Sequence, residues 1–169
     1  LVLYIANEQD VIIASMRGSL VQDQRSIENL LDIRLFSPVE LPVLIIDRAT
    51  TLIQYRRRGL SAVMRCLFIR ACKDSHVKNI VITVNDGVSR IPHLKELGFV
   101  FEKADTSKRD QIFFNNTSDV LFGALHCSRF PGAEEIALKN LKTPLIHFSF
   151  DEQLEDQLIK YLGKTMPLT

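Results

Sequence analysis

The sequence has almost no net charge and no long apolar run, and each absence narrows the classes of function. Its 21 lysines and arginines nearly balance its 20 aspartates and glutamates, which gives a formal net charge of +1 at pH 7. A chain-wide attraction to nucleic acid or to an anionic membrane is therefore excluded, and any basic effect must be local. No apolar stretch reaches the length of a membrane span, and no signal peptide is recognisable. We expect a cytoplasmic protein with no nucleic-acid partner and no membrane span.

Cysteine is also sparse, with three residues, and this odd number does not suggest a disulfide framework. Cys66 and Cys72 lie six positions apart on a predicted helix and so face different sides of it, while Cys127 is distant. Neither these thiols nor any cluster of His, Cys and Asp has metal-ligand spacing, so we predict no metal site. The three thiols are expected to be reduced and mostly buried.

The sequence does contain enough hydrophobic material for one folded domain. Of its 169 residues, 46% are hydrophobic and 24% are charged, which is ordinary for a soluble protein with a single core. The chain is organised around residues 43–73. An apolar run at 43–46 predicts a buried strand, a polar turn follows at 54–59, and apolar residues at helical spacing over 60–71 predict an amphipathic helix.

The polar turn between this strand and helix has the features of an anion-binding site. A helix that begins there leaves several backbone N–H groups unpaired at the positive end of its dipole. Gly59 lets a ligand approach the backbone closely, and Arg56, Arg57 and Arg58 add positive charge. We infer a site for a phosphate or diphosphate, with a nucleotide-like cofactor as the favoured anion. The alternative is an ordinary solvated basic turn, and the stretch has neither a Gly-x-Gly-x-x-Gly motif nor a Walker loop.

The rest of the chain alternates between predicted strands and helices. Residues 1–6 and 11–16 form a hairpin, and a strand at 79–84 runs parallel to the central strand after a right-handed crossover. Because ligands in open α/β sheets bind beyond the carboxyl ends of such strands, Thr51 and Asn85 are expected to flank the site. The other predicted elements are a helix at 26–36 with Ser26 as N-cap, a short helix ending at Gly98, strands at 99–102, 112–114 and 120–122, a helix at 131–141, an edge strand at 145–148 and a terminal helix between Asp151 and Gly163.

Two short motifs resemble the signature of the GCN5-related N-acetyltransferase superfamily. Residues 56–61 (Arg-Arg-Arg-Gly-Leu-Ser) are similar to its Gln/Arg-x-x-Gly-x-Gly/Ala motif, with Ser61 in place of the usual Gly or Ala. Residues 94–99 resemble its Tyr-x-x-x-Gly-Phe, with Leu94 where the Tyr commonly lies. The resemblance extends over residues 1–105. It implies an α/β (α+β) fold with a mixed central sheet, whose parallel strands splay apart and which is flanked by helices.

The resemblance also implies how the chain is divided. Residues 1–169 would form a single acyltransferase domain in which the hairpin at 1–16 supplies the second and third strands. The first strand and its helices would then be absent or truncated. Residues 130–169 would be a C-terminal extension packed on the domain.

The activity implied by the resemblance is transfer of an acyl group from acyl-CoA or acetyl-CoA to a small-molecule amine, by direct attack in a ternary complex. The amine must lose a proton, the thioester carbonyl must be polarised and the thiolate must leave. A free strand N–H near Thr51 or Leu52 would polarise the carbonyl. The residues expected to bind the cofactor are Thr51, Leu52, Arg56, Arg57, Arg58, Gly59, Leu60 and Ser61.

Asp47 is the carboxylate best suited to act as the general base. It interrupts an apolar strand, where a charge is costly unless paired or functional, and it matches the position of a Glu in many members of the resembled family. The alternative is an ion pair, with Arg48 as the poorer partner because adjacent strand residues face opposite sides. For the general acid, Leu94 cannot donate a proton, whereas His93 titrates near neutral pH but points about 100° away. Asn85 completes the predicted catalytic set.

A second resemblance concerns the substrate. Residues 45–48 (Ile-Ile-Asp-Arg) resemble the Glu-x-Ser-Arg of the acyl-homoserine-lactone and long-chain N-acyl amino acid synthase branch, with Ile45 replacing the Glu. This branch implies substrate-binding roles for Arg48 and for Arg17, which is predicted to end a strand. It also implies acyl carrier protein as the alternative donor, and the basic turn would suit such an acidic partner.

Two functions of other classes stay open. Leu94 in place of Tyr would also fit a catalytically inactive acyl-CoA-binding sensor module. Nucleic-acid binding through the arginines at 56–58 is disfavoured by the near-neutral charge and by the few aromatic residues among the basic ones. The sequence does not determine the oligomeric state, and a homodimer is among the states that it allows.

Overall fold

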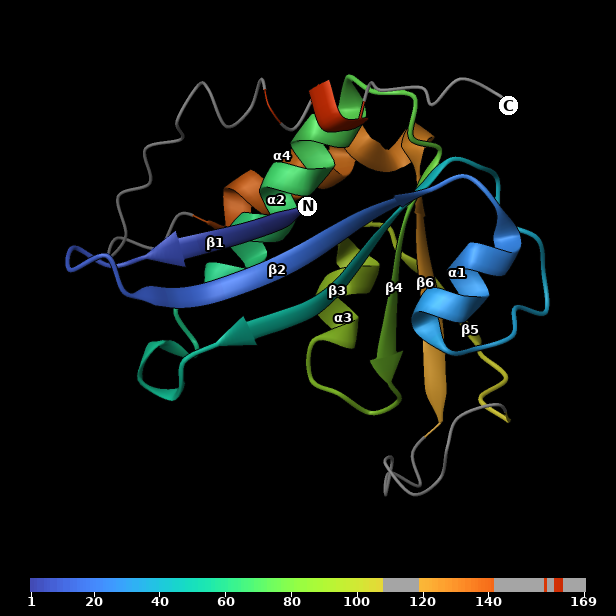
Figure 1. Ribbon diagram of the computed structural model, residues 1–169, viewed down its shortest axis with the longest axis horizontal. Coiled ribbons are helices and arrows are strands. Elements are labelled where there is room, and N and C mark those ends of the chain that lie inside the picture. Colours follow the sequence, from blue (N-terminus) through green and yellow to red (C-terminus); the bar gives the residue numbers. More distant parts are fainter. Residues whose placement is uncertain (108–118, 142–156, 158–159, 163–169) are drawn as a thin grey trace.

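The spacing of apolar residues along the chain separates strands, where they alternate, from helices, where they recur every three to four residues. The computed structural model describes residues 1–107, 119–141, 157 and 160–162, and Figure 1 labels their elements. The strands are β1 (Val2–Ala6), β2 (Ile12–Val21), β3 (Val43–Thr51), β4 (Asn79–Asn85), β5 (Val100–Lys103) and β6 (Val120–His126). The helices are α1 (Gln24–Leu31), α2 (Leu60–Lys73), α3 (Ile91–Glu96) and α4 (Phe130–Asn140), with the 3-10 turns η1 (Ile53–Tyr55) and η2 (Cys127–Arg129).

The strands form one mixed sheet in the order β1-β2-β3-β4-β6-β5. β3 and β4 are parallel, and the other neighbouring strands in the described part are antiparallel. β6 returns between β4 and β5, and it pairs with β4 along its whole length, from Asn79↔His126 to Asn85↔Val120. The predicted fold class, a mixed central sheet flanked by helices, is confirmed. The strand predicted at 120–122 extends to His126 and takes an interior place in the sheet.

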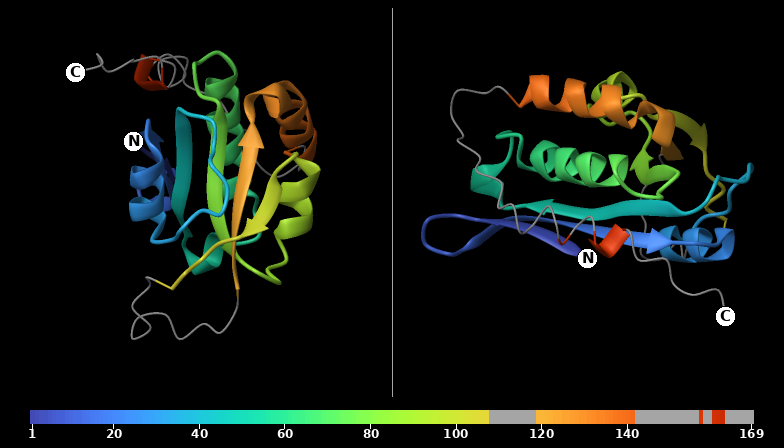
Figure 2. Two further views of the ribbon diagram at one scale, coloured as in Figure 1. Left: turned by 90° about the vertical axis from the view of Figure 1, so that its right-hand side faces the viewer. Right: turned by 90° about the horizontal axis from the view of Figure 1, so that it is seen from above.

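Both faces of the sheet are covered, which explains the nearly continuous apolar runs of the central strands. Successive side chains of a strand point to opposite faces. Val43 and Ile45 therefore pack into one core with α1, whereas Leu44 and Ile46 pack into the other with α2 and α4. Figure 2 shows α2 and α4 side by side on one face and α1 on the other. The layers place the amino end of α2 beside the carboxyl end of β3.

An ion pair joins α4 to α2. The Lys73 ammonium donates to Glu134 Oε2 at 2.6 Å, and Arg70 Nε lies 3.7 Å from Glu134 Oε1. The hydrogen bond to Glu134 raises the pKa of Lys73. The described residues 130–141 thus pack on the domain. The predicted strands at 112–114 and 145–148 lie outside the described residues, as does the terminal helix between 151 and 163 apart from residues 157 and 160–162, which are helical.

Two sequence-based boundaries are wrong. α1 begins at Gln24 rather than near Ser26, because Asp23 is the N-cap and accepts the Ser26 N–H at 2.8 Å. The helix ends at Leu31 rather than near residue 36, since Asp32 adopts a left-handed conformation with φ 52°. Arg17 lies inside the ten-residue strand β2 and not at its end.

The three cysteines are free thiols. Cys66 and Cys72 are buried and Cys127 is half-buried, in keeping with the prediction of reduced and mostly buried residues. Burial raises the pKa of Cys66 to about 11 and raises the pKa of Cys72 further. Of the helices that the structure describes, none is long and apolar enough to cross a membrane.

Candidate functional site

The parallel strands β3 and β4 separate toward their carboxyl ends. They pair at three positions, from Val43↔Asn79 to Ile45↔Val81, after which β3 continues to Thr51 and β4 to Asn85 without further pairing between them. Figure 1 shows the two strands starting side by side and then pointing in different directions. Among the residues that the structure describes, the edge of β3 that faces β4 beyond Ile45 therefore has no strand partner, and its backbone groups can pair with an extended ligand.

A β-bulge in β3 accompanies this separation. Arg17 pairs with Asp47 and Ser15 pairs with Thr50, so two residues of β3 oppose the single residue between Ser15 and Arg17 on β2. Arg48, the first residue of the bulge, has a left-handed φ of 49°. Because a bulge bends its strand and increases the local twist, it turns the end of β3 away from β4.

The predicted anion-binding turn is a cavity of about 580 Å³ between the end of β3 and the start of α2. Of the eight residues expected to bind the cofactor, seven line it, and Leu52 does not. The lining consists of Ala49, Thr50 and Tyr55 together with Thr51, Arg56, Arg57, Arg58, Gly59, Leu60 and Ser61. The structure thus brings together the residues that the sequence places around a phosphate.

The amino end of α2 has no internal cap. Gly59 is the N-cap residue with φ 78°, and no side chain caps the helix. The N–H groups of Ala62 and Val63 donate to Gly59 O, whereas those of Gly59, Leu60 and Ser61 have no acceptor within the described residues. Unpaired amides at the positive end of a helix dipole attract an anion.

The three arginines of the turn are exposed around these amides. Arg58 lies over the ring of Tyr55 with its guanidinium carbon 5.2 Å from the ring centroid, and Arg56 Nε donates to Thr51 O at 3.3 Å. Arg57 has a left-handed φ of 63°, which helps the chain to turn sharply before the helix. The turn therefore presents guanidinium groups and free amides to one cavity.

A second cavity, of about 240 Å³, occupies the space where β3 and β4 separate. Ile46 and Ile82 line it from one row of side chains and Asp47 and Thr83 from the other, so the cavity opens between the strands. The remaining lining residues are Met16, Arg48, Ala49, Arg65, Val84, Arg90 and Leu94. Ala49 lines both cavities, so the anion-binding turn and the space between the strands are neighbours.

Asp47 forms an ion pair with Arg17 across the β2–β3 ladder. Arg17 Nε donates to Asp47 Oδ1 at 2.7 Å, and Arg17 Nη2 contacts the other carboxylate oxygen. This hydrogen bonding raises the pKa of Arg17. The partner is thus another basic group and not Arg48, as the sequence-based alternative allowed. Because this carboxylate already accepts two guanidinium hydrogen bonds, the role of Asp47 in catalysis stays a prediction.

The other predicted catalytic and substrate residues lie in different places. Arg48 is exposed and lines the cavity between the strands. His93 does not line it; its Nδ1 lies 3.6 Å from Glu96 Oε2, and the neighbouring Leu94 faces the cavity instead. Asn85 pairs with Val120 at the end of the β4–β6 ladder and lines neither cavity.

Leu52 cannot provide a free N–H for the thioester carbonyl. Its N–H donates to Ile13 O at 2.9 Å, because the β2 strand still runs beside the chain at this point. The prediction for Leu52 is therefore wrong. Any backbone donor to a carbonyl must come from the edge of β3 that faces β4.

Arg65 and Arg90 are the lining residues that sequence reasoning missed. Arg65 belongs to α2 and is half-buried, and Arg90 precedes α3 and is exposed. Burial lowers the pKa of Arg65 to about 10, and the nearby charge of Arg90 adds to this effect. The available signal was weak: Arg65 lies between Met64 and Cys66, which are both buried.

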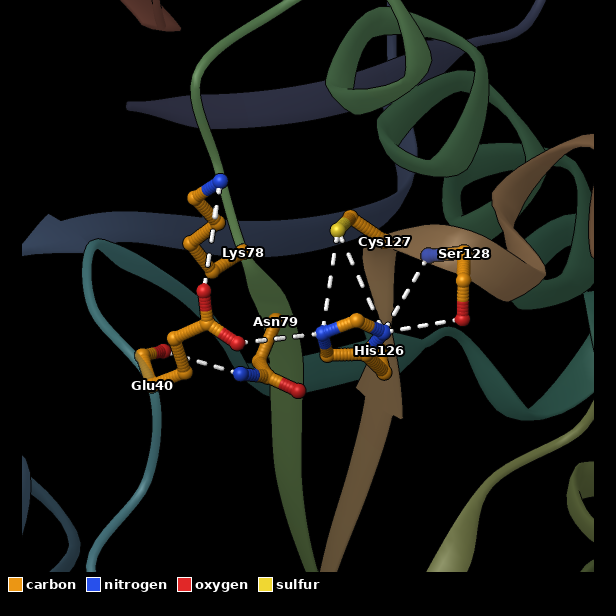
Figure 3. Close-up of polar contacts among 6 residues, drawn as sticks. All are labelled: Glu40, Lys78, Asn79, His126, Cys127 and Ser128. Carbon is orange, nitrogen blue, oxygen red and sulfur yellow. Dashed lines mark hydrogen bonds and ion pairs between the residues drawn. The ribbon is translucent and has the colours of Figure 1, made fainter.

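A different polar cluster lies at the opposite end of the parallel pair (Figure 3). His126 Nε2 lies 3.2 Å from Glu40 Oε2, and its Nδ1 accepts the Ser128 N–H at 3.3 Å. Since Nδ1 is an acceptor, the neutral ring carries its proton on Nε2 and donates it to Glu40. Glu40 O also accepts from the Asn79 side chain at 2.8 Å, and Lys78 Nζ lies 3.9 Å from Glu40 Oε1.

This cluster fastens the loop before β3 to the amino end of β4. The Lys78 ammonium lies near the Glu40 carboxylate, and His126 caps η2. Within the described ranges, no group of three or more His, Cys, Asp and Glu residues could hold a metal ion.

Comparison with known proteins supports the fold. No family model matches the chain, and no curated protein matches its sequence. The CoA-dependent acyl-homoserine lactone synthase MesI superposes with a TM-score of 0.55 at 11% identity, over 86% of this chain and 71% of that one. The CoA-dependent synthase BjaI, in a structure with SAM and isopentyl-CoA, gives 0.51 at 8% identity over 93% and 73%.

An N-acetyltransferase is similar as well. The ribosomal-protein-S18-alanine N-acetyltransferase from Escherichia coli gives a TM-score of 0.50 at 14% identity, over 75% of this chain and 68% of that one. These likenesses show that the fold is that of the GCN5-related N-acetyltransferases and acyl-homoserine lactone synthases.

Proposed function

We propose that the chain is an N-acyltransferase that moves an acyl group from a coenzyme A thioester to an amine. The observation that carries this proposal is that the uncapped amino end of α2 lies next to the cavity where β3 and β4 separate, with Ala49 lining both cavities. A donor with a diphosphate at one end and an amide-bearing arm at the other fits this arrangement. The amides and arginines of the turn would hold the diphosphate, and the open edge of β3 would pair with the arm.

The reaction needs little beyond positioning. The amine nitrogen attacks the thioester carbonyl carbon, a C–N bond forms, the C–S bond breaks and the thiolate leaves, while the amine releases one proton. Holding both reactants in the separation between the strands supplies much of the acceleration. A backbone N–H on the free edge of β3 beyond Ile45 would stabilise the negative charge on the carbonyl oxygen.

Asp47 is our proposal for the group that receives the proton. Of the residues that line the cavity, it is the one carboxylate. Arg17 orients it through their hydrogen bonds. The proton can pass from the amine to Asp47 directly or through one water molecule.

Acyl carrier protein is the alternative donor. The exposed guanidinium groups of Arg56, Arg57 and Arg58 would bind acidic side chains of a carrier as well as a diphosphate. In both cases the arm enters the same separation between β3 and β4.

A binding module without catalysis is the second candidate function, and the lining of the cavity favours it in one respect. Leu94, which lines the cavity, cannot donate a proton to the leaving thiolate, and His93 is turned toward Glu96. Mass spectrometry of the parent protein with a panel of amines distinguishes the two functions. Tight cofactor binding with no amide product would favour the binding module.

Calorimetry with acetyl-CoA and longer acyl-CoAs tests the proposal directly. Arg58→Glu removes a guanidinium, and Gly59→Glu adds a carboxylate at the free amides, so each should weaken binding by about tenfold or more. Arg129→Glu is the matched control, because it reverses an exposed charge beside α4, away from both cavities. If the parent binds neither any acyl-CoA nor acyl carrier protein, the proposal is wrong.

A further inference from the structure

Three guanidinium groups meet at the cavity between β3 and β4 without a carboxylate partner. Arg48 comes from β3, Arg65 from α2 and Arg90 from the residue before α3. None of them has an ion pair or a side-chain hydrogen bond within the described part of the chain. The carboxylate that lines the same cavity, Asp47, is already paired with Arg17. The cavity thus has an excess of positive charge.

Other partly buried cations of the chain do have carboxylate partners. Arg17 pairs with Asp47, and Lys73 pairs with Glu134. Arg65 is also half-buried, and burial together with the like charge of Arg90 lowers the pKa of Arg65 to about 10. A half-buried cation beside a second cation is unfavourable unless an anion joins them.

We propose that Arg65 and Arg90 bind an oxyanion, either a carboxylate or a phosphate, that is carried by the acceptor amine. The assignment to the acceptor rests on the proposed acyltransferase function. The diphosphate of the donor belongs to the turn before α2, so it does not supply this anion. Two guanidinium forks match the paired oxygens of a carboxylate or a phosphate and would orient the amine toward the thioester.

The size of the cavity restricts the acceptor further. Its volume of about 240 Å³ is below the range of roughly 300–1,000 Å³ that is usual for drug-sized ligands. An amine with the dimensions of an amino acid or an amino phosphate fits this space. Arg48, which is exposed at the cavity, adds positive charge along the path of an anionic acceptor.

Binding and turnover are tested separately, so that this proposal and the proposed function can fail independently. In the binding experiment, glycine and phosphoethanolamine are titrated into the protein saturated with coenzyme A, which occupies the turn before α2. The counterparts that lack the oxyanion are glycinamide and ethanolamine. We expect the compounds that carry the oxyanion to bind at least about tenfold more tightly, because a charge-assisted hydrogen bond contributes that much.

The variants Arg65→Gln and Arg90→Gln should abolish this preference while leaving the affinity for coenzyme A within about twofold. Arg129→Gln, outside both cavities, is the control. Since Arg65→Gln removes an unpaired charge, it should fold as well as the parent, and thermal unfolding checks this. The same compounds are also titrated into Arg58→Glu without coenzyme A, so that binding of the oxyanion can be measured independently of the cofactor. If the parent protein does not bind coenzyme A, that result counts against the proposed function but not against the oxyanion site.

In the turnover experiment, the 20 amino acids and their amides are compared in pairs with acetyl-CoA as donor. We expect kcat/KM to favour an acid over its amide, and the ratio to fall about tenfold in Arg65→Gln. Equal binding by the parent of the compounds with and without the oxyanion would overturn the proposal. A preference for succinyl-CoA over acetyl-CoA that is lost in Arg65→Gln would also overturn it, because the anion would then come from the donor.

Discussion

The two ends of the β3–β4 pair differ in whether their charged side chains have partners within the protein. At the amino ends the strands are paired, and Glu40 has Lys78 and His126 as polar partners there. At the carboxyl ends the strands are apart, and Arg65 and Arg90 line a cavity whose one carboxylate, Asp47, is already paired with Arg17. We call the paired amino ends of β3 and β4 the closed end and their separated carboxyl ends the open end. The polar groups of the closed end bind one another, whereas the open end leaves backbone amides and guanidinium groups for a ligand. This difference indicates that the open end is the site and that the closed end holds the strands together.

The largest effect is expected from filling the open end. Thr83→Phe places a ring in the cavity between β3 and β4, so the acyl group can no longer reach the acceptor, and kcat/KM should fall by about 100-fold or more. Steady-state kinetics measures this change. Thr83→Val, which keeps the size, is the control. Unchanged kinetics in Thr83→Phe would show that the reaction takes place elsewhere.

Asp47→Asn tests whether Asp47, at the open end, serves only as the ion-pair partner of Arg17 or also as the general base. The change leaves Arg17 without its ionic partner and should lower the free energy of unfolding by about 1–2 kcal/mol, as measured by urea denaturation. If Asp47 is also the base, the acid limb of the pH–rate profile disappears in the variant. A stability loss with an unaltered pH profile would mean that Asp47 only forms an ion pair.

Arg65→Leu should stabilise the protein, in contrast to most substitutions on a helix. Burial lowers the pKa of Arg65 in the folded protein to about 10, below its ordinary value, so the charged form destabilises the fold. This cost is fully present below pH 10 and disappears as the pH rises from there toward the ordinary pKa of arginine. We expect a gain of about 1 kcal/mol that is constant between pH 6 and 9, after allowance for solvent screening.

A lower stability of Arg65→Leu across pH 6–9 would contradict this account. It would indicate that the side chain contributes favourable packing that outweighs the cost of its charge. Urea denaturation at several pH values, with Arg129→Leu as the exposed counterpart, separates these two contributions.

The smallest effect is expected at the closed end. His126→Ala removes the hydrogen bond to Glu40 and the cap of η2, but the residues are exposed, so the loss should be about 0.5–1 kcal/mol. Activity should stay unchanged, because the cluster lies at the far end of the strands from both cavities. A large loss of activity in His126→Ala would contradict the claim that the closed end only holds the strands together.

Local sequence patterns predicted the part of the site that is contiguous in the chain. The strand, turn and helix of residues 43–73 appear as predicted, and the residues from Thr51 to Ser61, apart from residues 52–54, surround one cavity. The prediction for Leu52 failed because its N–H is taken by Ile13, a residue whose position depends on the length of β2. A strand boundary 30 or more residues away cannot be derived from the turn itself.

The sequence by itself determined the uncapped helix start, because the glycine, the arginines and the apolar spacing act over a few residues through backbone geometry and the helix dipole. The tertiary structure alone decided that β3 leaves β4 after Ile45, that Asp47 meets Arg17, and that Arg65 meets Arg90. These three features depend on strand register and on how α2 and α3 pack over the sheet. Register and packing are set by contacts between distant segments, which no single stretch of the chain contains.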